Sequence, residues 1–149
     1  MGGWRERVRA GWDAVRSAFT GALSPRDVFV AIFLGVFIGC LPTYGLHVVL
    51  SLALARVWGL NPVLMTVACN ISNPLFMPLL IGAEIYVGEL VLDGVARPVH
   101  VPSTGEELMA MVRDGGHLLW ACTVGSVFVG LALGAVLGGL GAAVAWARR

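Results

Sequence analysis

The sequence predicts an all-α membrane protein with an N-terminal amphipathic helix, two proline-broken helical hairpins that are re-entrant or kinked, and one long C-terminal transmembrane helix. Three observations predict this class. The chain of 149 residues is 58% hydrophobic and 13% charged, whereas soluble domains are about 25% charged. Polar segments that contain proline interrupt the apolar sequence at residues 42–45 and 70–74. Residues 118–146 form an uninterrupted apolar run that is long enough to cross a bilayer.

The composition also limits the partners and the compartment. A net charge of +1 offers no basic surface for a nucleic acid. Five of the ten arginines precede the first apolar run, which predicts a cytoplasmic N-terminus by the positive-inside rule. That arginine-rich start is also too long for a cleavable signal peptide. Cys40, Cys69 and Cys122 stand in apolar segments without a C-x-x-C spacing, so we expect no disulfide, no metal site and no cofactor.

Two parts of the chain are expected outside the membrane core. Residues 1–23 are predicted to form an amphipathic interfacial helix, and an ordinary helix docked on the membrane domain fits equally. The pattern consists of apolar residues at steps of three and four, namely Trp4, Val8, Trp12, Val15 and Phe19. Residues 24–149 are expected to form a single membrane-embedded helical domain, interrupted by a polar loop at about residues 93–117 that we place on the outer side.

The first broken unit begins at Ser24 and Pro25, which suit the N-cap and the first position of a helix. The apolar residues 28–41 cover about 21 Å as a helix, which is less than the ~30 Å hydrocarbon core. Pro42 lacks a backbone N–H and Gly45 adopts angles that other residues avoid, so the helix ends there. Either the two pieces form a re-entrant hairpin, or they form one kinked span that is over-long and tilted.

The second unit repeats this pattern. Asn61 and Pro62 form another helix start, and the short apolar piece after them stops at a polar segment that ends in Pro74. A longer apolar piece follows, which contains Pro78 and Glu84. A carboxylate near a helix centre costs about 2.5–3.5 kcal/mol on membrane-insertion scales. We therefore expect Glu84 to face protein, where it is able to carry a proton.

Small residues form two ridges that suit close helix packing. On the first helix they are Ala31, Gly35 and Gly39. On the last helix they recur at every fourth position, as Ser126, Gly130, Gly134, Gly138 and Ala142. Such ridges allow two helix backbones to approach closely. The sequence leaves open whether these contacts form within one subunit or between the subunits of a homo-oligomer.

The polar residues of the two breaks are the candidate substrate-binding site. We expect Thr43 to cap the half-helix that holds His47, and Asn73 with Pro74 to cap the other. Both half-helices would start inside the membrane, where two N-termini with free N–H groups favour an anion. Alternatively, the polar side chains only satisfy backbone groups that the breaks set free. The full set is Thr43, Tyr44, Gly45, His47, Asn70, Ser72, Asn73 and Glu84.

At these residues the sequence resembles a bacterial membrane family, domain of unknown function 2062. Members of that family carry a P-T-x-G-x-Q break, then S-N-P-x-T-x-P, then a glutamate and a glycine. His47 replaces the usual glutamine and Phe76 the usual threonine, so a site built on those polar groups would bind a different ligand here. The resemblance covers residues 24–146, and its matching residues are Pro42, Thr43, Tyr44, Gly45, Ser72, Asn73, Pro74, Pro78, Glu84 and Gly88.

The resemblance implies a multi-pass protein of the bacterial cytoplasmic (inner) membrane, surrounded by membrane lipids. The family has no settled activity. Some of its members are joined to glycosyltransferase domains, which implies work near envelope glycolipids or their phosphate carriers. An envelope glycosyltransferase is therefore an expected partner.

Two functions fit these observations. The first is a transporter or translocator of a small anion or a phosphate-bearing envelope lipid, bound between the two half-helix N-termini. The alternative is a non-catalytic membrane scaffold for an envelope glycolipid or glycosyltransferase system, docked through the N-terminal helix or the glycine ridges. The sequence contains no H-E-x-x-H, no G-x-S-x-G and no phosphate-binding loop, so we do not expect an enzyme.

Overall fold

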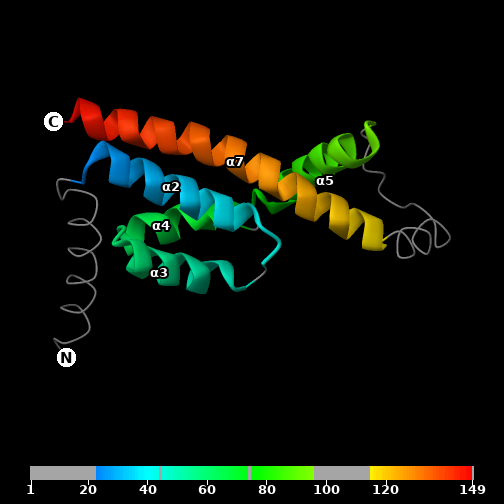
Figure 1. The fold of residues 1–149 in the computed structure, drawn as a ribbon, viewed down its shortest axis with the longest axis horizontal. Coiled ribbons are helices and arrows are strands. Elements are labelled where there is room, and N and C mark those ends of the chain that lie inside the picture. The colour runs from blue at the N-terminus through cyan, green and yellow to red at the C-terminus, as the bar shows by residue number, and fades with distance from the viewer. Residues whose placement is uncertain (1–22, 44, 74, 96–114, 149) are drawn as a thin grey trace.

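The computed structural model describes residues 23–43, 45–73, 75–95 and 115–148, and within them it contains helices and no strand. The expected amphipathic helix at the N-terminus, most of the polar loop, Tyr44 and Pro74 lie outside the described residues. The elements, shown in Figure 1, are α2 (Pro25–Cys40), α3 (His47–Trp58), α4 (Pro62–Cys69), the 3₁₀ turn η1 (Asn70–Ser72), α5 (Met77–Asp93) and α7 (Gly115–Ala147).

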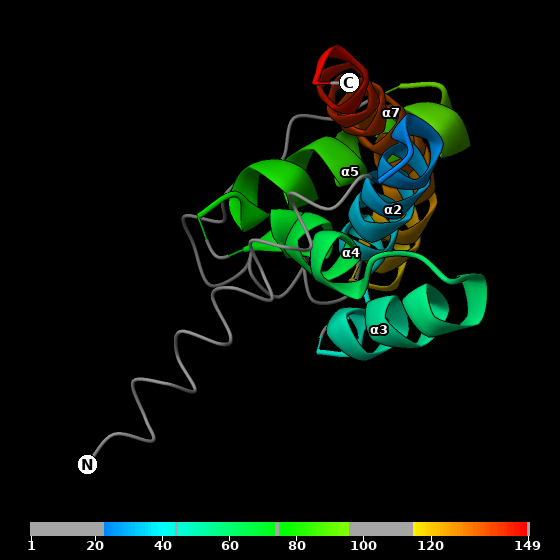
Figure 2. The ribbon, with the colours of Figure 1, turned by 90° about the vertical axis from the view of Figure 1, so that its left-hand side faces the viewer.

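The long helix α7 is the element on which the others assemble. It has 33 residues, so it is about 50 Å long at 1.5 Å per residue. The C-terminal half of α7 packs along α2, and its N-terminal half packs along α5 (Figure 1). On its other side α2 packs against α4, and α3 lies beyond α4 (Figure 2). The helix α2 therefore lies in the middle of the assembly.

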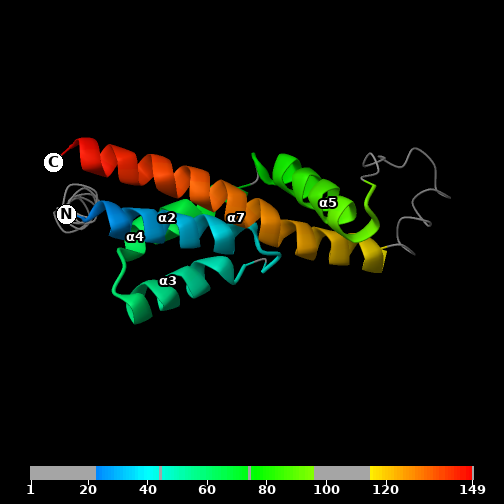
Figure 3. The same cartoon turned by 45° about the horizontal axis from the view of Figure 1, so that its top comes forward.

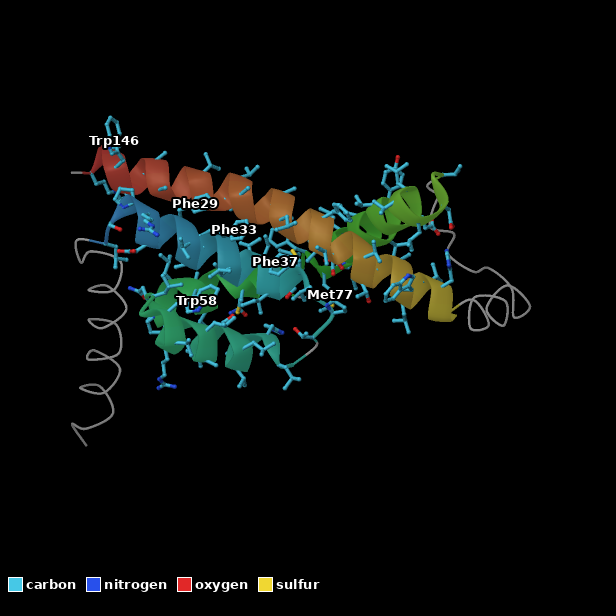
Figure 4. All side chains as sticks on the ribbon, in the orientation of Figure 1. Phe29, Phe33, Phe37, Trp58, Met77 and Trp146 are labelled. Carbon is cyan, nitrogen blue, oxygen red and sulfur yellow. The ribbon has the colours of Figure 1, made fainter. Side chains whose placement is uncertain are left out.

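The glycine ridge of α7 packs against α2 within the same chain. A Cβ atom at Gly134 would lie 2.9 Å from the carbonyl oxygen of Phe33, and one at Gly138 would lie 3.0 Å from that of Phe29. Phe29, Phe33 and Phe37 stack in a row along α2, with ring centroids 5.8 and 6.4 Å apart (Figure 4). A Cβ at Gly130 would lie 3.1 Å from a ring carbon of Phe37. This ridge is therefore a contact inside one subunit.

The second ridge packs on the opposite face of α2. A Cβ at Gly35 would lie 2.5 Å from the carbonyl oxygen of Met65, and one at Gly39 would lie 2.5 Å from that of Cys69. Both neighbours belong to α4, which begins at the expected cap: the Asn61 side chain accepts hydrogen bonds from two backbone N–H groups, at 3.0 Å each. Two ridges on two faces thus hold α2 between α7 and α4.

The helix α3 returns alongside α2 rather than continuing its direction (Figures 1 and 3). It ends at Gly59, which adopts φ of 64° as the left-handed C-cap, and the N–H of Leu60 donates to the carbonyl of Ala55 at 2.9 Å. That arrangement lets the chain reverse into α4 within three residues. Only Ser51 and Ala55 of α3 are buried. The helix therefore presents most of its apolar surface outward.

Candidate functional site

The first break is a tight turn and not a capped helix start. The N–H of Leu46 donates to the carbonyl of Thr43 at 2.9 Å, and Gly45 has φ of 83°, which fits the glycine position of a type II turn. The N-cap of α3 is Leu46, without a side-chain hydrogen bond. The expected cap by Thr43 is therefore wrong, because the turn carries its side chain away before the helix begins. The Thr43 hydroxyl is buried and has no hydrogen-bond partner among the described residues.

The second break does carry a side-chain cap. The Asn73 side-chain oxygen accepts from the N–H groups of Leu75 and Phe76, at 2.9 and 3.3 Å, and its carbonyl accepts from Met77 at 2.9 Å. Asn73 thus caps the turn from which α5 starts, although α5 itself begins at Met77. Across this break the chain bends by 76°. The start of α5 therefore runs in a different direction from α4 and η1.

The two breaks meet at one small cavity of about 30 Å³. Its wall includes His47 and Met77, which are the first residues of α3 and α5, and Met77 lies near the C-terminal end of α2 in Figure 4. The helix starts that sequence reasoning expected to converge therefore share this space. The lining residues are Gly39, Cys40, Leu41, Pro42, His47, Ser72, Met77, Leu80, Ile81 and Glu84.

Glu84 is the chemically distinctive member of this wall. Its side chain is 2% exposed, and its Oε2 accepts a hydrogen bond from the Cys122 thiol at 3.4 Å. Its Oε1 is buried without a hydrogen-bond partner among the described residues. An occupied space of about 10–15 Å³ is enough for one water, so the 30 Å³ cavity that Glu84 borders has room for water. The expectation that Glu84 faces protein agrees with this burial.

The remaining candidate residues do not gather at this cavity. Asn70 and Asn73 instead line a second, larger hollow of about 380 Å³, which Phe76 also borders. The amide nitrogen of Asn70 donates to the carbonyl of Thr66 at 2.8 Å. The other walls of this hollow are apolar: Ile32, Val36, Leu64, Val67, Ala68, Ile71 and Leu137. The structure thus divides the predicted polar site into a small cavity with a carboxyl group and an apolar groove edged by amides.

The close contact between α5 and α7 was not identified from the sequence. A Cβ at Gly88 would overlap the carbonyl of Ala121, and one at Gly125 would overlap the carbonyl of Glu84. Gly88 was noted only as part of a motif. Ala121 and Gly125 are four residues apart on α7, and Glu84 and Gly88 are four residues apart on α5. This spacing is the sequence signal for a close helix contact, but only the structure shows that the two pairs meet. This crossing fixes Glu84 against α7.

Two further contacts involve charged groups. Asp93 at the end of α5 accepts from His117 near the start of α7, with Oδ2 and Nε2 3.2 Å apart. This pair joins the two ends of the polar loop at a partly exposed position. Glu89 is also buried, with 5% of its surface exposed. Burial at the α5–α7 contact therefore extends one turn beyond Glu84.

One described helix is long and apolar enough to cross a membrane, and there are two if the bent pair of α4–η1 with α5 counts as one span. That helix is α7, and only 17% of its most apolar 18-residue window is buried inside the protein. The core helix of a soluble protein would be mostly buried. The length, apolarity and exposure of α7 therefore indicate an association with membranes.

Comparisons with known proteins identify the family of this chain and nothing more specific. No curated protein matches it, and no solved structure matches it. A model of the family DUF2062, described as an uncharacterized protein conserved in bacteria, matches residues 13–149. That match covers nearly the whole chain, including every residue of both breaks. The chain therefore belongs to the bacterial DUF2062 family.

Proposed function

We propose that this protein is a multi-pass protein of the bacterial inner membrane that moves a phosphate-bearing envelope lipid across it. The observation that carries the proposal is the shared cavity: the first residues of α3 and α5, His47 and Met77, line the same space. In this proposal α2 and α3 form a re-entrant pair, and α7 spans the bilayer. The N-terminus lies in the cytoplasm, on the side where the arginines gather.

The phosphate chemistry follows from the two helix starts. The first N–H groups of an α-helix have no partner within the helix, and the helix dipole places about half a positive charge there. The two starts add their fields at the cavity. At α5 the N–H of Met77 already donates to the carbonyl of Asn73 and Pro78 has no N–H, so the start of α3 would supply the N–H donors to the oxygens of the anion. Discontinuous helices of membrane transporters hold anionic groups by this means. Among the described residues no arginine lines the cavity, so backbone groups would supply the attraction.

The second hollow favours a lipid over a free anion. It is about 380 Å³, its walls are mainly aliphatic, and Asn70 and Asn73 stand at its edge. An acyl chain fits apolar walls, and amide groups suit the glycerol or sugar part of a headgroup. Since Asn73 also caps the turn before α5, the groove ends at the break that borders the small cavity. The lipid would lie in the groove with its phosphate toward the helix starts.

The described conformation is closed to such a headgroup. A cavity of about 30 Å³ holds water but not a phosphate group with its substituents. Binding must therefore separate the start of α3 from the start of α5. The exposed position of α3, with only Ser51 and Ala55 buried, allows that movement at a smaller loss of buried surface than a movement of α2. The helix α3 is thus the expected moving part.

A lipid-flip assay with a matched pair of variants tests this function. The purified protein is placed in vesicles of phosphatidylethanolamine and phosphatidylglycerol that contain fluorescent phosphatidylglycerol, and dithionite reports how much label becomes accessible. Asn73→Ala removes the cap beside the cavity, whereas Asn61→Ala removes an equivalent two-bond cap at the start of α4. We expect movement with the wild type and Asn61→Ala, and a loss with Asn73→Ala.

Two outcomes contradict the proposal. The first is a rate with the wild type that equals the rate in empty vesicles. The second is the same rate with Asn73→Ala as with Asn61→Ala. The scaffold alternative makes a different prediction, since deletion of residues 1–20 would then abolish function in cells while substitutions at the two breaks would leave it intact.

A further inference from the structure

Glu84 presents a buried oxygen atom for which the fold supplies no partner. The side chain is 2% exposed, and Oε1 makes no hydrogen bond with the described residues. The other oxygen, Oε2, accepts from the Cys122 thiol at 3.4 Å. An ionised carboxylate accepts hydrogen bonds at both oxygens, whereas a protonated one carries a hydrogen on one of them. The pattern of one accepting oxygen and one free oxygen beside a water-sized cavity suits the protonated form.

In the described part of the chain, no arginine borders the cavity beside Glu84 to balance an ionised carboxylate. The titratable groups that face it are Cys40 from α2, His47 from α3 and Cys122 from α7, and none of the described arginines lines the cavity. A buried charge without a cation is strongly disfavoured, so a proton is the simplest way to neutralise it. Glu89, on the same helix, is five residues further along α5.

The proposed phosphate and an ionised Glu84 exclude each other. The cavity that receives the headgroup between the starts of α3 and α5 is lined by Glu84 itself. When the cavity has opened to admit the headgroup, the phosphate and an ionised Glu84 would repel each other with little screening by water. A phosphate therefore enters only when Glu84 carries a proton.

From these contacts we propose that Glu84 binds a proton that travels with the phosphate, so that lipid movement is coupled to protons; this inference rests on the function proposed above. The proton leaves Oε1 for a water in the cavity, a proton from that water passes to one ring nitrogen of His47, and His47 releases a proton from its other ring nitrogen to the exterior, so that the cavity loses one positive charge. The carboxylate that remains expels the phosphate. His47 is partly exposed and is the first residue of α3, so it connects the cavity with the exterior.

Infrared spectroscopy tests the proton site without any transport. In lipid vesicles at neutral pH, the wild type should show the carbonyl stretch of a protonated carboxylic acid. That band should be absent in Glu84→Gln and present in Glu89→Gln, which is the matched control because Glu89 is another buried acid of the same helix. Absence of the band in the wild type, or its persistence in Glu84→Gln, overturns the proposal.

The second measurement is the pH dependence of movement, with two probes that distinguish the source of the phosphate. Fluorescent phosphatidylglycerol reports a lipid, and radioactive inorganic phosphate taken up by the same vesicles reports a free anion. We expect the wild-type rate for the lipid to be level at and below neutral pH and to fall about tenfold for each pH unit in the alkaline range where Glu84 loses its proton, which is the slope for one proton. Glu84→Gln, which mimics the neutral acid, should change less than about twofold, and Glu84→Asp should restore the slope.

The outcomes separate the two proposals. The same pH slope in Glu84→Gln as in the wild type overturns proton coupling and leaves lipid movement in place. No movement of either probe by the wild type overturns the proposed function and the coupling together, while the infrared band still decides whether Glu84 holds a proton. Size-exclusion profiles in detergent verify that each variant is folded. If Glu84→Gln does not fold, Glu84→Asp supplies the test.

Discussion

The contact between α5 and α7 predicts a large effect for one methyl group at Gly125. A Cβ atom there would overlap the carbonyl group of Glu84, and it would lie 2.8 Å from the backbone nitrogen of Gly88. A flexible side chain can rotate away from a new atom, but the backbone of a helix cannot. Gly125→Ala must therefore push α5 and α7 apart along their contact.

The size of the effect follows from two opposing contributions. Overpacking of a tight contact costs about 1–3 kcal/mol, and the upper end applies because both neighbours are backbone. Alanine favours a helix over glycine by about 1 kcal/mol, which offsets part of that cost. Gly139→Ala is the matched control, because a Cβ at Gly139 meets nothing within 4 Å. The two variants should differ by about 3 kcal/mol in free energy of unfolding, roughly a hundredfold in the equilibrium constant.

The assay is a titration of both variants with sodium dodecyl sulfate in mixed micelles, followed by tryptophan fluorescence. Each variant is compared with the wild type at the same detergent fraction. Gly125→Ala should unfold at a lower dodecyl sulfate fraction than the wild type, and Gly139→Ala at the same or a higher one. If Gly125→Ala is as stable as Gly139→Ala, the close approach of α5 and α7 at Glu84 is refuted.

Two further predictions concern other parts of the fold. Gly134→Leu adds a side chain where a Cβ already lies 2.9 Å from the carbonyl oxygen of Phe33, so α2 should separate from α7 at a cost of about 3 kcal/mol or more; unchanged thermal stability together with unchanged size in detergent would contradict this. Thr43→Val removes a buried hydroxyl that has no partner among the described residues, so stability should stay the same or rise by up to about 1 kcal/mol. A measured loss of stability or of lipid movement in Thr43→Val would instead show that this hydroxyl binds something.

The helix starts were predictable because the physics of a cap is local. Ser24 accepts from the N–H of Asp27 at 3.1 Å, and Asn61 accepts from two N–H groups at the start of α4, both as their positions before a proline indicate. Asn73 does the same within its break. The prediction that Thr43 caps a helix was wrong because Gly45 turns the chain before α3 begins. A glycine with positive φ between a polar residue and a helix moves the helix start beyond reach of the side chain.

The candidate site was only partly predictable. Both breaks were found because Pro42 and Gly45, or Asn73 and the proline after it, end helices by their own chemistry. Which polar residues line the same cavity could not be predicted, since that depends on the directions of α3 and α5 after each break. His47, Ser72 and Glu84 came together, whereas Asn70 and Asn73 border a different hollow. The Cys122 partner of Glu84 is 38 residues away in the chain, and no local pattern links them.

By itself, the sequence determined the helical class, the two interruptions, the long apolar helix at the C-terminus and the ridges of small residues. These features depend on composition, on periodicity and on the backbone limits of proline and glycine, all of which act within a few residues. Only the tertiary structure decided that the glycine ridges meet α2 inside one chain, that α5 crosses α7 at Glu84, and that the helix starts open on one cavity. Those contacts join residues far apart in the chain, and the packing of whole helices, rather than any local preference, selects them.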